Sequence, residues 1–389
     1  MPKVAVVGGG PAGSACAARL AAHGIDVTLF ERTAFPRTKV CGEYLNAAAQ
    51  EELRELGVAE AVAPECNAIA GIRLHVDDAE LELPFAKPAW ALARSRLDDL
   101  LLGHARAQGA QVVTARVEDV KREAERLRVC FRDASGLERT FEADAVVGAD
   151  GLGSLVARKC GLSSNAKRRG RFAVGGHYSG FGSLDGFIEM YVTKQAYFAI
   201  NPLDDDLANV MIVVDEANLH EWTGAIDTNM EQTSLQLAAG KRGVGAVRRV
   251  GKRVAIGPLV HDVRSVADGN VYLVGDAGGF VDPFTGQGVF LALRSAKLTA
   301  AAVQAQLFRT ESAQRATARY QREHDRIFRS RARVASLVSL LIKTPWLSKR
   351  AARNLQRSAD LRTSIMAVIS GQEPAQRPFN AATVLRLVA

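Results

Sequence analysis

The stretch VAVVGGGPAG, residues Val4–Gly13, decides the fold of this 389-residue chain. Its first four residues are apolar and small or β-branched, which predicts a buried strand, and its glycines then turn the backbone into a helix that begins near Pro11. Gly8 permits the tight turn, Gly10 lets a phosphate approach the backbone, and Gly13 lets the helix pack closely on the strand.

A second strand and an acidic residue complete this pattern. Val27–Phe30 is the predicted strand, and it leads into Glu31, eighteen residues after Gly13. In a βαβ unit an acid at this place meets a ribose hydroxyl, while the positive N-terminal end of the helix faces the phosphates. The sequence therefore predicts dinucleotide binding near its N-terminus.

Composition and cysteine usage set the class of protein. A chain with 48% hydrophobic and 24% charged residues is ordinary for a globular protein, and its length suits two interlocked domains. The first strand begins at residue 4, so we expect no signal peptide, and no apolar run approaches the roughly 20 residues that span a bilayer. The five cysteines are scattered without metal-site spacing, which indicates a reducing compartment and no bound metal. We expect a cytoplasmic protein, with association to a membrane as an open alternative.

The order of predicted elements indicates an α/β fold into which a second sheet is inserted. After the βαβ opening, the pattern predicts a helix over 47–56 that ends at Gly57, a helix over 95–107 and a buried strand over 145–148. Four strands then follow one another between residues 172 and 215, a pattern typical of an antiparallel sheet. A buried strand over 271–274 and a helix over 288–306 return to the first pattern. The predicted domains are a discontinuous cofactor-binding domain (1–70, 95–165 and 265–330), a substrate domain (71–94 and 166–264) and a basic helical C-terminal cap (331–389).

Three further motifs lie at strand and helix ends. Gly148–Gly151 reads Gly-Ala-Asp-Gly, Gly275–Ala277 reads Gly-Asp-Ala, and Asp282–Gly288 reads Asp-Pro-Phe-Thr-Gly-Gln-Gly. Arg94 opens the helix that precedes them. This set, in this order, resembles the flavoprotein hydroxylases and their relatives, which bind FAD. The resemblance implies a glutathione-reductase-type FAD-binding Rossmann fold.

The chemistry of FAD suits these residues. Asp276 can accept ribityl hydroxyls, Arg94 can face a phosphate, and the backbone amides of 286–288 can meet the negative end of the reduced ring. Gln287 stands where many relatives have Glu, which removes a negative charge near the ring. The resemblance implies cofactor contacts from Gly8, Gly10, Pro11, Ala12, Gly13, Glu31, Arg32, Lys39, Cys41, Gly42, Arg94, Val117, Asp150, Gly151, Ser154, Gly275, Asp276, Pro283, Gly286, Gln287, Gly288 and Val289.

The segment Lys39–Glu43, Lys-Val-Cys-Gly-Glu, narrows the resemblance to the geranylgeranyl reductase branch. That branch stands beside the aromatic hydroxylases and the flavin-dependent halogenases, and its Cys-Gly element lies close to the flavin ring. The thiol of Cys41 could then protonate a substrate carbanion after hydride transfer, or it could be a small buried hydrophobe. The halogenase motif W-x-W-x-I-P has no tryptophan counterpart in Tyr197–Pro202. Of the lipid reductase motif Y-x-W-x-F-P, this segment keeps only the Tyr and the Pro.

Two residues of the predicted substrate sheet join Cys41 as catalytic candidates, namely Tyr197 and His177. Only one dinucleotide motif is present, so NAD(P)H would bind transiently as electron donor, or electrons would come from a separate donor protein. The expected function is FAD-dependent, geranylgeranyl-reductase-like reduction of a carbon–carbon double bond in a hydrophobic isoprenoid or polyketide-like substrate. One alternative is an FAD-dependent monooxygenase that hydroxylates an aromatic or polyketide ring with NAD(P)H and O2. The other is a non-catalytic flavin redox sensor.

The C-terminal region carries the positive charge of the chain. From Ser312 onward, 15 Lys and Arg stand against 4 Asp and Glu, whereas the whole chain has a net charge of +8. Apolar residues recur at helical spacing over 334–342, and a basic helix is predicted over Lys349–Arg362. Such helices can cap the body of the protein or lie on an anionic membrane. The region shows no aromatic interleaving and no nucleic-acid-binding module, so we do not expect nucleic acid as a partner.

Overall fold

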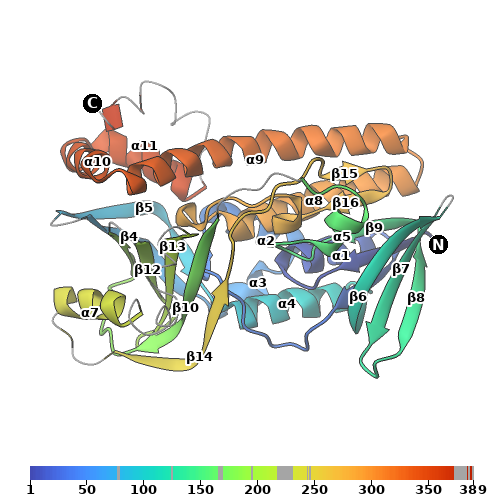
Figure 1. Cartoon of the computed structure of the whole chain (residues 1–389), viewed down its shortest axis with the longest axis horizontal. Coiled ribbons are helices and arrows are strands. Elements are labelled where there is room, and N and C mark those ends of the chain that lie inside the picture. The colour runs from blue at the N-terminus through green and yellow to red at the C-terminus, as the bar shows by residue number, and fades with distance from the viewer. Residues whose placement is uncertain are drawn as a thin grey trace.

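A computed structural model of the chain describes residues 1–76, 79–123, 126–164, 170–193, 196–216, 231–242, 244, 247–371, 383, 386 and 387. These residues form two eight-stranded sheets, over which the C-terminal helices pass (Figure 1). The predicted α/β fold class, with a Rossmann-type domain and a second sheet, is confirmed.

The first sheet has the strand order β15-β16-β9-β1-β2-β6-β7-β8. Its central strand β1 (Lys3–Val7) pairs in parallel with β2 (Asp26–Glu31) on one side and β9 (Ala145–Gly148) on the other. The parallel part continues to β6 (Gln111–Glu123) and β16 (Val271–Leu273). Segments far apart in the sequence therefore meet at β1. The antiparallel edges are β7 (Arg126–Asp133), β8 (Glu138–Ala143) and β15 (Ala267–Asp268).

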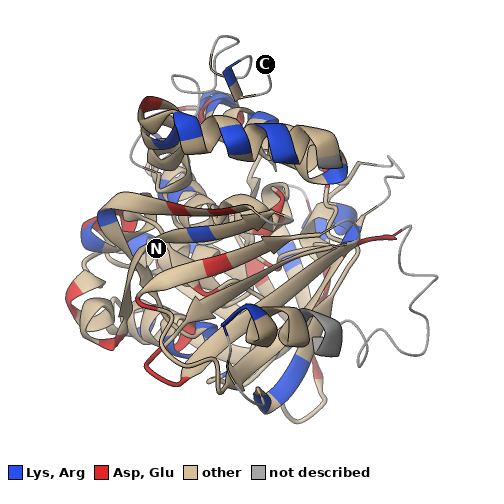
Figure 2. Cartoon of the chain, turned by 90° about the vertical axis from the view of Figure 1, so that its left-hand side faces the viewer, with Lys and Arg blue, Asp and Glu red and all other residues tan. Residues whose placement is uncertain are grey.

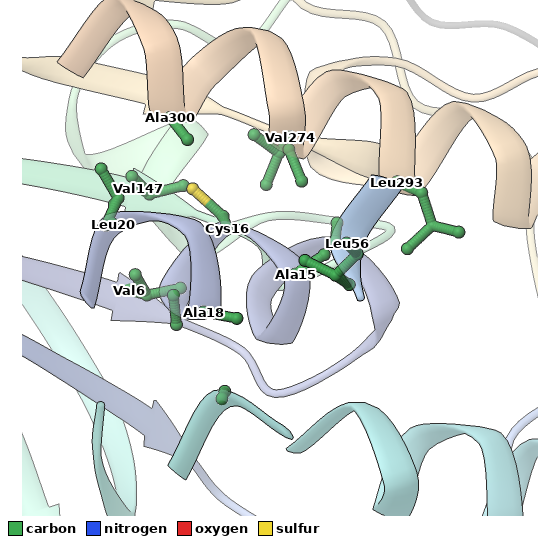
Figure 3. Close-up of a cluster of buried hydrophobic side chains, with 14 of the residues drawn as sticks. Val6, Ala15, Cys16, Ala18, Leu20, Leu56, Val147, Val274, Leu293 and Ala300 are labelled. Atoms are coloured by element: carbon green, nitrogen blue, oxygen red, sulfur yellow. The ribbon is translucent and has the colours of Figure 1, made fainter. Parts of the chain in front are cut away.

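Helix α1 (Pro11–Ala21) packs against α4 (Arg94–Ala107) and α8 (Gly288–Leu307), and all three share one hydrophobic cluster with the parallel strands. Figure 3 shows Cys16 of α1 among apolar side chains from β1, β9 and α8. The carboxyl ends of parallel strands meet at one edge of a sheet. Because β1, β9 and β16 are parallel, the glycine turn after β1 lies near the turns after β9 and β16.

The second sheet has the order β14-β10-β13-β12-β11-β4-β5-β3. Its pairings are antiparallel, as predicted, except that β4 and β11 run parallel. A hairpin forces neighbouring strands to be antiparallel, but these two come from separate parts of the chain, so their direction is free. The strands are β3 (Tyr44–Leu45), β4 (Asn67–Val76), β5 (Ala79–Ala91), β10 (Arg171–Ser179), β11 (Phe187–Val192), β12 (Ala196–Pro202), β13 (Leu207–Asp215) and β14 (Arg248–Ile256).

Several short helices lie between the strands, and the predicted helix over 47–56 is confirmed as α2 (Ala47–Leu56). The Asn46 side chain accepts a hydrogen bond from the N–H of Ala49 at its start, and Gly57 ends it in the left-handed conformation. The other short elements are α3 (Ala59–Val62), η1 (Ala63–Glu65), α5 (Leu155–Lys159), α7 (Glu231–Arg242), η4 (Gly275–Gly278) and η5 (Pro283–Thr285).

Three helices form the C-terminal cap. The long α9 (Ala313–Lys343) runs the length of the molecule, and α10 (Pro345–Arg357) and α11 (Ala359–Ile369) turn back at one end (Figure 1). The prediction of one helix over Lys349–Arg362 is wrong. The chain leaves helical geometry at Ser358, whose side chain caps the start of α11 by accepting from Leu361 N–H at 3.2 Å. Within the described ranges, no helix has the length and apolar character needed to cross a bilayer.

Candidate functional site

The turn after β1 has the geometry of a phosphate-binding glycine loop. Gly8 has φ +107°, and a Cβ there would overlap the carbonyl of Ala149 at the end of β9. A Cβ on Gly13 would overlap the carbonyl oxygen of Gly8, so α1 packs directly on the turn. A Cβ on Gly10 would instead meet only the guanidinium of Arg37, at 3.7 Å. The space beside Gly10, at the N-terminal end of α1, is therefore open to a ligand.

Glu31 and Arg37 lie beside this turn. The Glu31 carboxylate accepts hydrogen bonds from Gly9 N–H at 2.8 Å and Thr33 N–H at 3.0 Å. The buried guanidinium of Arg37 lies 3.7 Å from Glu31 and 3.3 Å from the carboxylate of Asp98. Its Nε has no hydrogen-bond partner among the described residues. A buried hydrogen-bond donor without a partner, next to a glycine turn, suits a ligand with oxygen acceptors, such as phosphate or ribose.

Arg94 lies further along the same side of the site. Its guanidinium forms two hydrogen bonds to Asp98, at 2.8 and 2.9 Å, and also lies beside the thiol of Cys41. Its backbone N–H donates to Glu43 at 2.7 Å. In the described structure, Arg94 thus links α4 to the Cys-Gly-Glu segment.

The Asp-Gly motif after β9 orders its own helix. Asp150 accepts hydrogen bonds from the Ser154 hydroxyl at 2.5 Å and from Leu155 N–H at 2.6 Å, while Ser154 accepts from Ala157 N–H at 3.0 Å. These contacts cap α5. Gly151, with φ +75°, has open space where a Cβ would lie.

Side chains of the second sheet hold the Cys-Gly-Glu segment in place. Asn209 donates to the carbonyl of Cys41 at 2.7 Å, and Asn201 donates to the carbonyls of Gly42 and Glu43 at 2.9 and 3.0 Å. The Nε2 of His177 lies 2.7 Å from the buried carboxylate of Glu43. This hydrogen bond raises the pKa of His177 against the opposing effect of burial. Cys41 and Gly42 are thus fixed between the two sheets.

Cys41 and Gly42 open onto a cavity of about 160 Å³ between the second sheet and the turns after β16. The cavity brings together Cys41, Gly42, Tyr197, Asp276, Pro283 and Gly286 from the predicted site, whereas His177 lies outside its lining. The remaining wall is largely aliphatic and aromatic. Its residues are Val40, Tyr44, Ile72, Leu152, Ala173, Ile188, Met190, Ala199, Asn201, Met211, Val213, Ile256, Leu259, Phe280, Phe284, Thr285 and Ile369.

Burial keeps the acidic groups of this cavity protonated to higher pH than usual. It raises the pKa of the Cys41 thiol, against which the Arg94 guanidinium acts in the opposite direction. Burial likewise raises the pKa of Asp276, and it raises that of Tyr197 well above the ordinary value. The thiol and the phenol are therefore neutral at pH 7 and can donate protons into an apolar space.

Tyr197 is held by an ionic network. Its hydroxyl donates to Asp282 at 3.0 Å, and its ring packs edge-on against Phe284 at 5.0 Å between centroids. Arg171 contacts Asp282 at 2.5 Å and Asp215 at 3.0 Å. This network fixes the phenol at the cavity wall.

The other predicted cofactor residues occupy different surroundings. The side chain of Gln287 donates to the carbonyls of Val368 and Ile369 and accepts from Arg331, so it contacts the cap. Gly288 begins α8, Val117 and Val289 pack in hydrophobic clusters, and Arg32 and Lys39 are exposed. Pro11 and Ala12 are buried in the first turn of α1, and Gly275 has φ +57°.

No site role is predicted from the sequence for several side chains that shape the site, although Glu43 and Asp282 stand at the ends of two quoted motifs. These side chains are Arg37, Glu43, Asp98, Asn201, Asn209 and Asp282. Arg37 carried a local signal, because it is a cation between the strand that ends at Glu31 and Cys41. The two asparagines gave none, since their contacts span about 160 residues of sequence.

Comparison with known proteins agrees with this geometry. Residues 1–334 match the family model of the FAD binding domain. The chain is 29% identical over 320 residues to a menaquinone reductase of Mycobacterium tuberculosis, covering 76% of this chain and 75% of the relative. It is 28% identical over 327 residues to a chloroplastic geranylgeranyl diphosphate reductase of Oryza sativa subsp. japonica, covering 77% and 66%. The crystal structure of CmlS, a flavin-dependent halogenase, superposes with a TM-score of 0.79 at 26% identity, covering 99% of this chain and 76% of that one.

Proposed function

The chain belongs to the FAD-binding domain family and is an FAD-dependent enzyme, and from this premise we propose that it reduces a carbon–carbon double bond in a hydrophobic, isoprenoid-bearing substrate. The observation that carries the proposal is the cavity. Its lining combines apolar residues of the second sheet, residues of the predicted FAD motifs, and two neutral proton donors, Cys41 and Tyr197.

The residues present fit FAD. The glycine turn after β1, with its open space at Gly10 and the unsatisfied Nε of Arg37, suits the diphosphate. Glu31 is placed to exchange its backbone contact for a ribose hydroxyl. Asp276 and the backbone of Gly286 line the cavity, where the ribityl chain and the ring would reach the substrate.

When bound in reduced form, FAD supplies a hydride to one carbon of the double bond. The chain supplies the proton for the neighbouring carbon, from the Cys41 thiol or the Tyr197 hydroxyl. Cys41 lies beside Arg94, which stabilises the thiolate left after proton transfer. Tyr197 donates to Asp282 in the resting arrangement, so it would have to exchange that partner for substrate. We therefore assign the proton transfer to Cys41 and the positioning of the substrate to Tyr197.

The size and polarity of the cavity support a segment of isoprenoid as substrate. An apolar cavity of about 150 Å³ binds benzene. The cavity of 160 Å³ here therefore accommodates an isoprenoid segment about as large as benzene beside the proton donors. Menaquinone and geranylgeranyl diphosphate, named for two relatives, both carry isoprenoid chains. On β12, Tyr197 and Ala199 face the cavity. The tryptophans of the halogenase motif have no counterpart on this strand, which favours reduction over halogenation.

The electron donor is a separate part of the proposal. The chain has one dinucleotide motif, which we assign to FAD. NAD(P)H would therefore bind transiently, or a separate donor protein would deliver the electrons. Comparing the anaerobic rate of flavin bleaching by NADH, NADPH and reduced ferredoxin distinguishes these donors.

The test of the reaction uses holoenzyme reduced anaerobically with dithionite and then mixed with menaquinone or a geranylgeranyl lipid. We expect oxidised flavin to return without oxygen and the product to gain two hydrogens, as measured by absorbance and mass spectrometry. A product that gains one oxygen atom, and only after oxygen is admitted, would make the protein a monooxygenase. Flavin that cycles without any product would make it a redox sensor.

A further inference from the structure

The outward face of α10 is basic and carries an exposed tryptophan. Trp346 is 64% exposed, and Arg350, Arg353 and Arg357 follow it at helical spacing on the same side. Lys349, between Trp346 and Arg350 in the sequence, is also exposed. The helix contains no acidic residue. Figure 2 looks at this end of the molecule, and the blue of Lys and Arg lies along the outward side of the helix.

The inward face of α10 is apolar. Ala351, Ala352 and Leu355 are buried in the same hydrophobic cluster as residues of β4, β5 and α11. The helix is thus fixed to the second sheet by one face and presents cations with the other. This arrangement is that of a helix lying flat on a surface, and it differs from a spanning helix, which is apolar all round.

The cap also forms part of the substrate cavity. Ile369 of α11 lines the cavity, and Ile342 at the end of α9 packs in one cluster with Tyr197. A second large apolar side chain, Leu340, is 54% exposed close to the corner between α9 and α10. The basic face therefore lies on the helix that joins α9, which packs against Tyr197, to α11, which lines the apolar cavity.

We propose that α10 docks the protein on an anionic membrane surface, with Trp346 in the interface and Arg350, Arg353 and Arg357 on the lipid phosphates. Charge complementarity supports a membrane as the partner, because a leaflet rich in anionic lipid attracts a cluster of cationic side chains without acidic neighbours on the same helix. Trp favours the boundary between headgroups and acyl chains, where its ring is buried and its N–H is hydrated. This proposal goes beyond the proposed reaction and does not depend on it.

The expected size of the effect follows from the charges. Each cation near an anionic leaflet contributes about 1 kcal/mol, which is about fivefold in partitioning. Removing three of them therefore lowers the partition coefficient on the order of 100-fold. Added salt weakens the interaction in the same direction, since it screens the exposed charges.

The experiment is co-sedimentation of full-length holoprotein with vesicles. We expect binding to vesicles of phosphatidylcholine and phosphatidylglycerol in a two-to-one ratio, and little binding to phosphatidylcholine alone. The variant R350Q/R353Q/R357Q should lose about 100-fold in binding. The emission of Trp346 should shift to shorter wavelength on binding, and W346F should abolish that shift while the protein still sediments.

The matched control removes the same charge from the opposite end of the molecule. Arg106 near the end of α4, and Arg116 and Lys121 of β6, are exposed, and β6 lies far from α10 in Figure 1. The variant R106Q/R116Q/K121Q should bind vesicles as the unaltered protein does. The proposal is wrong if the unaltered protein binds neither vesicle, or if both triple variants lose binding equally. It is also overturned if a DNA duplex binds in place of vesicles and R350Q/R353Q/R357Q loses that binding. Because no turnover is measured, none of these outcomes affects the proposed reaction.

Discussion

Cys41 has the surroundings of a proton donor. Burial raises the pKa of its thiol, the Arg94 guanidinium lies beside it, and its backbone carbonyl is held by Asn209. A neutral thiol at a fixed position in an apolar cavity can lose a proton to a carbanion, and the adjacent guanidinium then stabilises the thiolate. The same surroundings make the residue unreactive as a nucleophile at neutral pH.

The first prediction concerns this proton. In Cys41→Ala we expect FAD content to stay unchanged and the rate of double-bond reduction to fall by about 10²-fold or more. Single-turnover reoxidation of the flavin by substrate measures that rate. Cys66→Ala is the control, because Cys66 is another free cysteine and does not line the cavity. An unchanged rate in Cys41→Ala would assign the proton to Tyr197.

The second prediction concerns the pair His177–Glu43. The pKa of His177 is raised in the folded protein, so the pair stabilises the fold fully below the unfolded pKa near 6.5. That stabilisation is lost as the pH rises through the raised pKa of His177. We expect His177→Gln to lower the free energy of unfolding by about 1.5 kcal/mol at pH 6, and the difference to shrink toward pH 9.

Denaturant unfolding at several pH values measures this difference. His23→Gln is the control, since His23 is exposed and its ring nitrogen contacts the carbonyl of Arg19 just beyond the end of α1. A difference between His177→Gln and the unaltered protein that is constant from pH 6 to pH 9 would contradict the assignment of charge to His177.

At the scale of elements, the packing of α1 on the glycine turn has no spare room. A Cβ on Gly13 would overlap the Gly8 carbonyl, so either the helix or the turn must move. We expect Gly13→Ala to destabilise the fold by about 2 kcal/mol or more and to leave the purified protein short of FAD. Flavin absorbance per protein and denaturant unfolding measure the two effects.

Gly103 provides the control for that prediction within α4. Nothing lies within 4 Å of the position of its Cβ, and the helix continues through it. Gly103→Ala should stabilise the protein by about 0.5–1 kcal/mol, because alanine loses less backbone entropy in a helix. Equal effects of the two alanine substitutions would show that steric overlap at the turn is not what makes Gly13 necessary.

The sequence predicts elements well where their limits are set locally. The bounds of α2 follow from Asn46 and Gly57, and the start of α8 at Gly288 follows from the preceding glycines. The parallel pairing of β4 with β11 could not be predicted, because no hairpin joins the two strands. The contacts of Asn201 and Asn209 with the Cys-Gly-Glu segment join residues about 160 positions apart, so no local signal in the sequence predicts them. Gln287 lies within a motif predicted to contact the cofactor, yet long-range packing turns its side chain to the cap.

At the scale of the whole molecule, Gln287 joins the cofactor domain to the cap. Its amide donates to the carbonyls of Val368 at 3.2 Å and Ile369 at 3.1 Å, and its oxygen accepts from Arg331 at 3.2 Å. Burial lowers the pKa of Arg331 to about 10, so its cation is costly to leave without an acceptor. These bonds fix the end of α11 next to the cavity wall at Ile369.

The fourth prediction follows from this link. Gln287→Leu removes all three hydrogen bonds and should cost about 1–3 kcal/mol. We expect limited digestion by trypsin to release the C-terminal helices faster than in the unaltered protein, with the FAD-binding core left intact. Gln306→Leu is a matched control, because Gln306 accepts from Tyr272 at the far end of α8. Equal rates of digestion in both variants would contradict a specific role of Gln287 in holding the cap.

The strand order of the first sheet also fixes when this protein can fold during its synthesis. β1 is made first, but its neighbour β9 begins at residue 145 and the next strand, β16, at residue 271. At roughly 5–20 residues per second, the ribosome adds Leu273 at the end of β16 roughly 13–53 s after Val7 at the end of β1. Until then a nascent chain holds β1 and β9 with an open edge, and the turn that carries Asp276 does not yet exist. The cofactor can therefore bind with its full set of contacts only after the whole segment from β1 to Asp276 has been translated.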